Sequence, residues 1–121
     1  MIENRKYIRL KAPIGLVYRT LRKNKKGKET LTLVINISGG GLSFIPKEDV
    51  RQGDLLSLRI HIPHSKEPIE AIGEIAWFFV SNISSSNEKN KVVREAGLRF
   101  RELSPKNLNQ ILEYVHTIGI G

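Results

Sequence analysis

The chain has 121 residues, with 20 Lys and Arg against 12 Asp and Glu, and it contains no cysteine. This length suits one domain with its own core, so we interpret residues 1–121 as a single domain. The composition excludes thiolate catalysis, thiolate zinc sites and disulfides; because there is also no apolar run of about 20 residues and no signal-like N-terminus, we expect a cytoplasmic protein with no membrane span.

The net charge of +8 is concentrated at the N-terminal end of the chain. Residues 1–28 contain ten Lys or Arg and a single acid, Glu3, whereas residues 29–121 contain ten Lys or Arg and eleven acids. Concentrated positive charge attracts anions over a distance, so we expect an anionic partner at this end. The basic residues from Arg19 to Lys28 surround Asn24 and Gly27, and we interpret them as the solvated tip of a hairpin in preference to a binding surface.

Alternating apolar residues predict β-strands along the first two-thirds of the chain. Residues 14–18 and 31–35 predict two half-buried strands that flank the basic turn. Residues 42–44 predict a short strand that ends before Pro46, and residues 56–62 predict another that Pro63 stops. In the first two strands, the residues expected to be buried are Ile14, Leu16, Tyr18, Leu31, Leu33 and Ile35.

The last third of the chain predicts two long strands and a helix. Residues 69–80 are rich in β-formers, and Gly73 among them indicates a bulge or bend. We interpret the polar residues 81–91 as an exposed hairpin loop and residues 92–101 as the last strand. A helix is expected over 104–118, because Ser104 suits the N-cap and Pro105 the first helical position. About six antiparallel strands and one helix indicate a mainly β fold, either a small barrel or a sandwich.

Two short motifs carry the functional signal. In the first, Arg5 and Arg9 present planar cationic donors that can pair with the O6/N7 edge of guanine or with phosphate. In the second, Asn36 and Ser38 supply short hydrogen-bonding side chains before three glycines that leave the backbone accessible. Taken alone, the first motif is explained by a basic tail and the second by a glycine-rich turn.

In this order and at this separation, the motifs Arg-x-x-x-Arg and Asn-x-Ser-x-x-Gly resemble the signature of PilZ domains. That family consists of small β-barrel receptors for the bacterial second messenger cyclic di-GMP. The resemblance covers most of the chain, through Gly53-Asp54, the run from Gly73 to Trp77, the run from Gly97 to Phe100 and the terminal helix. It implies a six-stranded antiparallel PilZ-type β-barrel with a C-terminal α-helix, including the barrel closure that periodicity does not reveal.

The resemblance also implies a ligand site made of two separate segments. Residues 1–9 are expected to be a flexible segment whose two arginines clamp the guanine and phosphate groups. Asn36 and Ser38 would hydrogen-bond the ligand, and Gly41 would keep the backbone close to it. The implied ligand-binding residues are Arg5, Arg9, Asn36, Ser38 and Gly41, and weaker candidates are Asn4, Gly40, Trp77 and Arg94.

Three of the weaker candidates leave alternatives open. Many family members carry arginine at the position of Asn4, and its identity is associated with the binding of one or two ligand molecules, so the stoichiometry stays undecided. Trp77 suits stacking on a base but also suits a core or barrel-rim position. Arg94 suits either the pocket or an ordinary surface position.

The resulting hypothesis is a stand-alone cyclic di-GMP receptor and adaptor, with no cofactor, that passes its signal to an unidentified effector protein in motility or biofilm control. One alternative is a PilZ-like protein-interaction scaffold without a ligand. Another is a small basic nucleic-acid-binding β-barrel, which we disfavour because the eight Phe, Trp and Tyr residues form no evident stacking platform.

We expect neither catalysis nor a metal site. The sequence has no nucleophile with a base motif, no phosphate-binding loop of the Gly-x-x-x-x-Gly-Lys type and no paired carboxylates placed for acid–base work. His61 and His64 are three positions apart, so on a strand they would point to opposite faces, and no cysteine or clustered carboxylate completes a site.

Overall fold

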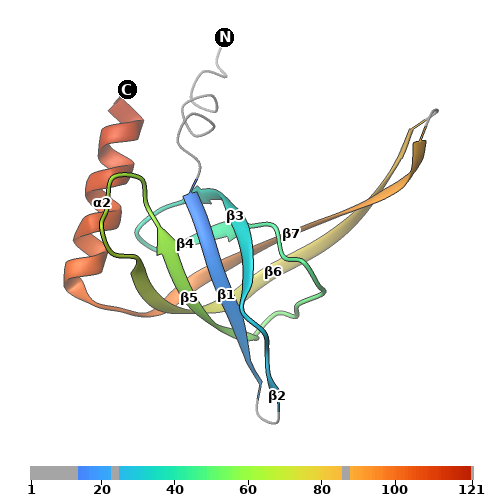
Figure 1. Ribbon diagram of the computed structural model, residues 1–121, viewed down its shortest axis with the longest axis horizontal. Coiled ribbons are helices and arrows are strands. Elements are labelled where there is room, and N and C mark those ends of the chain that lie inside the picture. Colours follow the sequence, from blue (N-terminus) through green and yellow to red (C-terminus); the bar gives the residue numbers. More distant parts are fainter. Residues whose placement is uncertain (1–13, 23–24, 86–87, 121) are drawn as a thin grey trace.

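A computed structural model describes residues 14–22, 25–85 and 88–120 (Figure 1). It contains seven strands and a helix at the C-terminal end. The elements are β1 (Ile14–Arg22), β2 (Lys25–Lys26), β3 (Thr30–Ile37), β4 (Gly41–Phe44), β5 (Leu55–His61), β6 (Ile69–Ser85), β7 (Glu88–Leu103) and α2 (Pro105–Ile120).

Six of the strands close into an antiparallel barrel, as the family resemblance implied. The strand order is β1-β3-β4-β7-β6-β5, and β5 pairs back with β1 from Gly15 opposite His61 to Thr20 opposite Leu56. The short β2 pairs with the end of β1, next to the hairpin tip expected from the basic residues. Because the ring of strands is closed, its backbone hydrogen bonds are satisfied without a free edge along the barrel.

The core fills the interior of the barrel and extends beneath α2. Leu56, Leu58 and Ile60 of β5 are almost completely buried, as their alternation predicted. The rings of Tyr18 and Phe44 pack edge to face with their centroids 5.3 Å apart. The other fully buried side chains come from β1, β6, β7, α2 and, at Pro46, the connection between β4 and β5.

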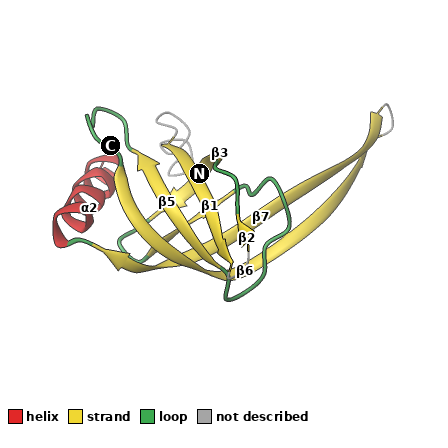
Figure 2. Cartoon of the chain, turned by 60° about the horizontal axis from the view of Figure 1, so that its bottom comes forward, coloured by secondary structure: helices red, strands yellow, loops and turns green. Residues whose placement is uncertain are grey.

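The helix α2 lies against one side of the barrel (Figure 2). Its buried Ile111 joins the barrel core. Ser104 caps its first turn, since its Oγ accepts a hydrogen bond from the N–H of Asn107 at 3.1 Å. The observed helix runs to Ile120, two residues beyond the predicted end.

The prediction that Leu31, Leu33 and Ile35 face the core is wrong. Their side chains are 68%, 53% and 36% exposed, and it is Thr32 and Val34 that point inward. The register explains the reversal. Residues directly opposite in a sheet share a face, and Thr32 lies opposite the buried Leu16 of β1. The Thr32 hydroxyl is satisfied inside the barrel because it donates to the carbonyl of Ile45 at 2.5 Å.

The interpretation of residues 81–91 as a loop is also wrong. β6 continues to Ser85 and β7 begins at Glu88, with Ile83 opposite Lys91. The two strands project together beyond the barrel as a long hairpin (Figure 2). Backbone hydrogen bonds between strands do not require apolar side chains, so a polar sequence can continue a ladder that the barrel has already started.

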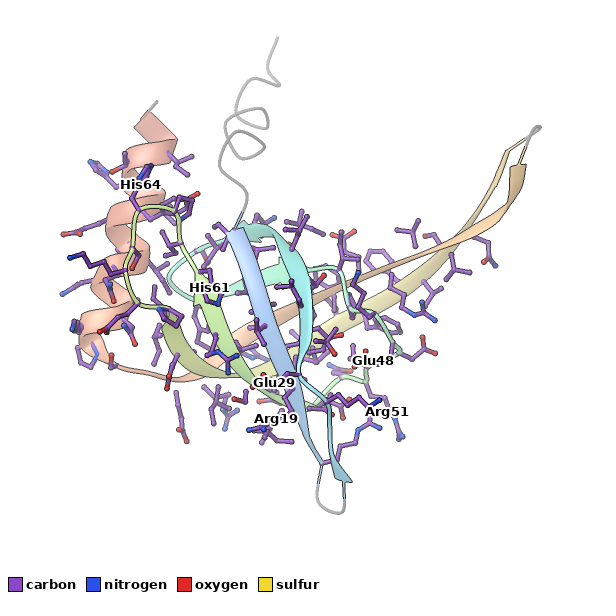
Figure 3. All side chains as sticks on the ribbon, in the orientation of Figure 1. Arg19, Glu29, Glu48, Arg51, His61 and His64 are labelled. Atoms are coloured by element: carbon purple, nitrogen blue, oxygen red, sulfur yellow. The ribbon has the colours of Figure 1, made fainter. Side chains whose placement is uncertain are left out.

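The buried hydroxyl of Tyr18 fastens the connection between β4 and β5 to the barrel. It donates a hydrogen bond to Oε1 of Glu48 and accepts one from the N–H of Lys47, both at 2.9 Å. Figure 3 shows Glu48 on this connection, beside the lower half of the barrel. Burial, together with the Glu48 carboxylate, raises the pKa of Tyr18 to about 12.

Replacing Tyr18 by Phe leaves the N–H of Lys47 without its acceptor, so we expect a loss of about 1–3 kcal/mol of unfolding free energy in denaturant titrations. Because the pKa of Tyr18 is raised in the folded state, the phenol ionises first in the unfolded chain. The wild type should therefore lose stability as the pH rises from about 10 to about 12, and Tyr18→Phe should lack this component. Parallel stability curves for the two proteins over this range would contradict the assignment.

Candidate functional site

A polar hollow of about 290 Å³ opens on the outer surface of the barrel where β3, β4, β7 and β6 lie side by side. Four of its lining residues are those singled out in the second motif: Asn36, Ser38, Gly40 and Gly41. Trp77 of β6 lines it as well. The structure thus brings together residues that are about forty positions apart in the sequence.

One continuous row of directly opposed residues crosses the hollow. Asn36 of β3 lies opposite Ser43 of β4, Ser43 lies opposite Gly97 of β7, and Gly97 lies opposite Trp77 of β6. Three spacings between neighbouring strands place the ends of this row roughly 14 Å apart. The small residues in the middle form the floor, and Asn36 and Trp77 form the two sides.

A one-residue irregularity in β3 turns Asn36 toward this hollow. Val34 lies opposite Phe44, but Asn36 lies opposite Ser43, so Ile35 is an extra residue in the strand. If β3 paired regularly through Ile35, Asn36 would point into the barrel on the same side as Val34, because side chains alternate with a period of two.

A second irregularity does the same for Trp77. Ile75 lies opposite Leu98 and Trp77 lies opposite Gly97, so Ala76 is extra in β6. The buried Ile75 and the 40% exposed Trp77 consequently point to opposite sides of the sheet. The register also shifts at Gly73, as predicted from the sequence, whereas neither irregularity at the hollow was anticipated.

Gly97 is required by the position of the tryptophan. A Cβ added at Gly97 would overlap the indole of Trp77, so only glycine lets the ring lie over this strand. The indole also packs edge to face against Phe79, with ring centroids 5.3 Å apart. Trp77 is therefore held in place on two sides while its remaining surface is open to solvent.

The turn between β3 and β4 is closed by its own backbone and by Ser38. The N–H of Ser38 donates to the carbonyl of Gly41 at 2.9 Å, and the N–H of Gly40 donates to the Ser38 hydroxyl at 3.2 Å. Leu108 and Leu112 of α2 lie behind Gly39, where an added Cβ would come within 2.9 Å of the Leu112 side chain.

Gly41 is required first of all by strand packing. A Cβ added there would collide with the carbonyl oxygen of Leu98 and come within 2.9 Å of the Cα of Arg99. The glycine thus lets β4 approach β7 closely at the edge of the hollow.

The amide of Asn36 has a defined orientation. Its Oδ1 accepts a hydrogen bond from the hydroxyl of Ser43 at 3.0 Å. Within the described part of the chain, no group accepts a hydrogen bond from its Nδ2. Asn36 therefore presents a donor to the hollow, which suits phosphate oxygens and the acceptor atoms of a base.

Two charged residues near the hollow were not identified from the sequence. Glu95 lines it and is the sole charged residue among the described residues that do so. Arg99 is exposed on the same face of β7, directly opposite Gly41. The sequence could have indicated both residues, because they alternate with Gly97 on the last strand. Glu95, Gly97 and Arg99 therefore share one face of the sheet.

Arg94 lies elsewhere. As the neighbour of Glu95, it points to the other face of β7, and its Nε is 2.9 Å from Oδ1 of Asp49 on the β4–β5 connection. The Arg94 guanidinium is therefore held by Asp49, and it does not line the hollow.

The first motif, with Arg5 and Arg9, and the weaker candidate Asn4 lie outside the described residues. The structure nevertheless fixes the point where that segment joins the barrel. β1 begins at Ile14, opposite Val34, two residues before Asn36. Five residues of extended chain span up to roughly 17 Å, so Arg9 is within reach of the hollow.

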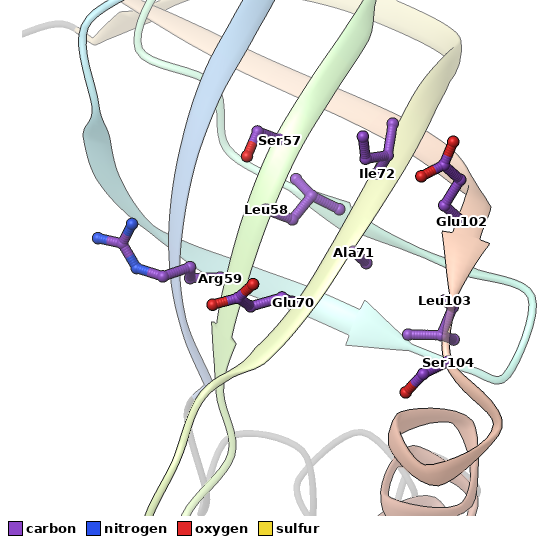
Figure 4. Close-up of a pocket in the computed structure, with 9 residues that line it drawn as sticks. All are labelled: Ser57, Leu58, Arg59, Glu70, Ala71, Ile72, Glu102, Leu103 and Ser104. Carbon is purple, nitrogen blue, oxygen red and sulfur yellow. The ribbon is translucent and has the colours of Figure 1, made fainter.

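A second hollow of about 400 Å³ lies between β5, β6 and the end of β7 (Figure 4). It is larger, but its charged groups suit a dianion poorly. Glu70 and Glu102 line it. The guanidinium of Arg59 pairs with the carboxylate of Glu29 at 2.8 Å, and this ion pair lowers the pKa of Glu29. We therefore do not assign a nucleotide site there.

The described residues contain no group of three or more His, Cys, Asp or Glu side chains placed to hold a metal ion. His61 lies on β5 and His64 on the turn that follows it (Figure 3). None of the helices in the described part of the chain is long and apolar enough to cross a membrane.

Several solved structures share this fold. MrkH of K. pneumonia, described as a c-di-GMP-dependent transcription regulatory factor, is 16% identical with a TM-score of 0.68, over 93% of this chain and 48% of its own. The Bacillus subtilis inhibitor of motility (MotI/DgrA) is 20% identical with a TM-score of 0.62, over 93% of this chain and 52% of its own. The present chain therefore spans about half the length of these two proteins.

The PilZ domain of YcgR from Escherichia coli, solved with c-di-GMP, is 9% identical with a TM-score of 0.60, over 85% of this chain and 81% of its own. None of the curated proteins matches the sequence. The PilZ domain family itself matches residues 3–117, which include both motifs, all of the strands and most of α2. The chain therefore belongs to the PilZ domain family.

Proposed function

We propose that this domain is a receptor for cyclic di-GMP, which it binds in the hollow beside the Asn36–Gly41 turn. The row from Asn36 to Trp77 carries this proposal, because two register irregularities turn a hydrogen-bond donor and an aromatic ring outward on either side of a floor of small residues. PilZ domains are binding domains rather than enzymes, and the YcgR domain was solved with c-di-GMP.

The two arginines of the first motif supply the positive charge that the hollow itself lacks. Cyclic di-GMP carries two negative charges, and the sole charged residue among the described lining residues is an acid. Arg5 and Arg9 pair with guanine O6/N7 and with phosphate, and the excess of positive charge in residues 1–28 steers the ligand toward them.

The barrel supplies the fixed part of the site. The Nδ2 of Asn36 donates a hydrogen bond to the ligand, and the hydroxyl of Ser38, which donates to the carbonyl of Gly41 at 3.4 Å, turns to the ligand on binding. Gly40 and Gly41 keep the backbone close to the ligand, and Trp77 stacks on one guanine. We leave Arg94 out of this site because of its ion pair with Asp49. Each bidentate arginine–guanine contact contributes roughly 1–3 kcal/mol, and micromolar binding requires about 8 kcal/mol.

Ligand binding orders residues 1–9 over the hollow and so creates a surface for an effector protein. The exposed apolar side chains of Leu31, Leu33 and Ile35 support this role, since they lie on the outer face of β3 and lead up to Asn36. Such a domain acts as an adaptor, because its output is a protein contact. A chain without cysteine suits the reducing cytoplasm, where we place this adaptor.

Isothermal titration with cyclic di-GMP tests the receptor function and its stoichiometry of one or two ligands. The double variant Arg5→Ala, Arg9→Ala should lose about 2–6 kcal/mol of binding free energy. The matched control, Lys6→Ala with Lys11→Ala, removes the same charge from the same end of the chain and should lose much less. Equal losses in the two variants would show that charge alone, rather than the arginine forks, binds the ligand.

Trp77 provides a second test because it is the single tryptophan of the chain. Its fluorescence should change on saturation with cyclic di-GMP, and Trp77→Leu should weaken binding by about 1–3 kcal/mol through the loss of stacking. Phe79→Leu, which alters the neighbouring ring, serves as the control and should have the smaller effect. Unchanged affinity in Trp77→Leu, with the protein still folded, would remove Trp77 from the site.

The ordering of the N-terminal segment is measured by backbone amide hydrogen exchange. Saturating cyclic di-GMP should slow exchange at residues 5–9, because ordering the segment withdraws its amides from free exchange with solvent. The amides of α2, which has no direct part in the proposed contacts, serve as the internal reference. If ligand binds but exchange at residues 5–9 stays the same, the ordering mechanism is wrong while the receptor function stands.

A further inference from the structure

Glu95 is an unexpected residue in a hollow assigned to a dianion. It lines the hollow, and within the described residues no group donates a hydrogen bond to its carboxylate or forms an ion pair with it. The neighbouring acids are engaged differently: Asp49 pairs with Arg94, and Glu74 pairs with Arg101 at 2.6 Å. A carboxylate that faced the phosphates of the ligand would weaken binding, so it must face a part of the ligand that donates hydrogen bonds.

Guanine has one edge with that property. Its N1–H and its 2-amino group are adjacent donors that point the same way, and an ionised carboxylate offers two acceptor oxygens and no donor. The opposite edge of the base, O6 and N7, consists of acceptors and suits arginine. One guanine can therefore be held by an arginine on one edge and by a carboxylate on the other.

The strand register places Glu95 where it can reach this edge. Glu95 lies two residues before Gly97 on the same face of β7, and the indole of Trp77 covers Gly97. Diagonal neighbours on adjacent strands are about 7–8 Å apart, within reach of a long side chain. A base stacked on Trp77 therefore turns one edge toward the carboxylate of Glu95.

The other polar groups of the hollow do not suit those two donors. The Oδ1 of Asn36 already accepts from Ser43, so its amide presents Nδ2, a donor. The Ser38 hydroxyl accepts from the N–H of Gly40. Among the described lining residues, Glu95 is the single carboxylate, and thus the one strong acceptor that is not already engaged.

The geometry points to Glu95 as the residue that selects guanine in this site, by accepting hydrogen bonds from N1–H and the 2-amino group of the base stacked on Trp77. This inference rests on the proposed function. Adenine presents an acceptor at N1 and lacks the 2-amino group, so the same carboxylate repels it. Glu95 thereby makes the hollow discriminate cyclic di-GMP from cyclic di-AMP.

The direction in which one substitution changes the affinity for cyclic di-GMP separates this role from simple electrostatics. Removing a negative charge strengthens the binding of a dianion if the charge acts only at a distance. Glu95→Gln keeps the shape of the side chain but replaces one acceptor oxygen by a donor, so we expect cyclic di-GMP to bind about 5- to 100-fold more weakly. Glu102→Gln, on the same strand but outside the hollow, is the matched control and should bind as tightly as the wild type or more tightly.

Changing the base of the ligand provides a test that complements the substitution of Glu95. Cyclic di-IMP lacks the 2-amino group but keeps N1–H, O6 and N7, so it should bind the wild type more weakly than cyclic di-GMP. The preference for cyclic di-GMP over cyclic di-IMP should shrink in Glu95→Gln, because the acceptor of the 2-amino group is gone. The preference over cyclic di-AMP should shrink as well.

The outcomes separate this inference from the proposed function. If the wild type binds cyclic di-GMP, and Glu95→Gln binds it equally or more tightly with unchanged preferences, the role of Glu95 is wrong and the receptor function stands. If the folded wild type binds no cyclic di-GMP, both fail. Weaker binding with reduced preferences in Glu95→Gln, at an unchanged melting temperature, supports the assignment.

Discussion

The alternation of side chains in a closed barrel is the constraint on which the candidate site depends. Every strand residue points either into the core or toward solvent, so a regular register would have buried Asn36 with Val34 and Trp77 with Ile75. One extra residue in β3 and one in β6 reverse that assignment without opening the barrel. The site therefore exists because two strands depart from regular pairing at the same level of the sheet.

The proposed site divides its chemistry between a fixed surface on the barrel and the positively charged residues that precede β1. The fixed surface holds donors, acceptors and an aromatic ring, but among its described residues it contains a single charge, and that charge is negative. The positive charge is concentrated in residues 1–28, and the part of the chain that precedes β1 joins the barrel at Ile14, opposite Val34 of β3. This separation would make ligand affinity depend on the segment and base selectivity on the barrel, with Glu95 as the selective group.

Packing around the hollow is tight on the sides that face the protein. Gly41 and Gly97 have no room for a side chain, because a neighbouring strand occupies the space in one case and the indole of Trp77 in the other. Leu112 of α2 lies behind the turn at Gly39, so the helix that completes the core also supports the turn that lines the hollow. Tight packing of this kind keeps a site in one geometry before the ligand arrives.

Except for the strand ends within residues 81–91, the sequence alone determined the order and type of the main elements, the order and separation of the two motifs, and the concentration of charge at one end, because each depends on local patterns. Tertiary structure decided which side of β3 is buried, since its apolar and polar residues alternate and only the pairing of Thr32 with Leu16 fixes the phase. It also decided that Trp77 faces outward and that Glu95 lines the same hollow as Asn36. A one-residue irregularity leaves no clear local signal, because it depends on the pairing of two strands that are distant in sequence.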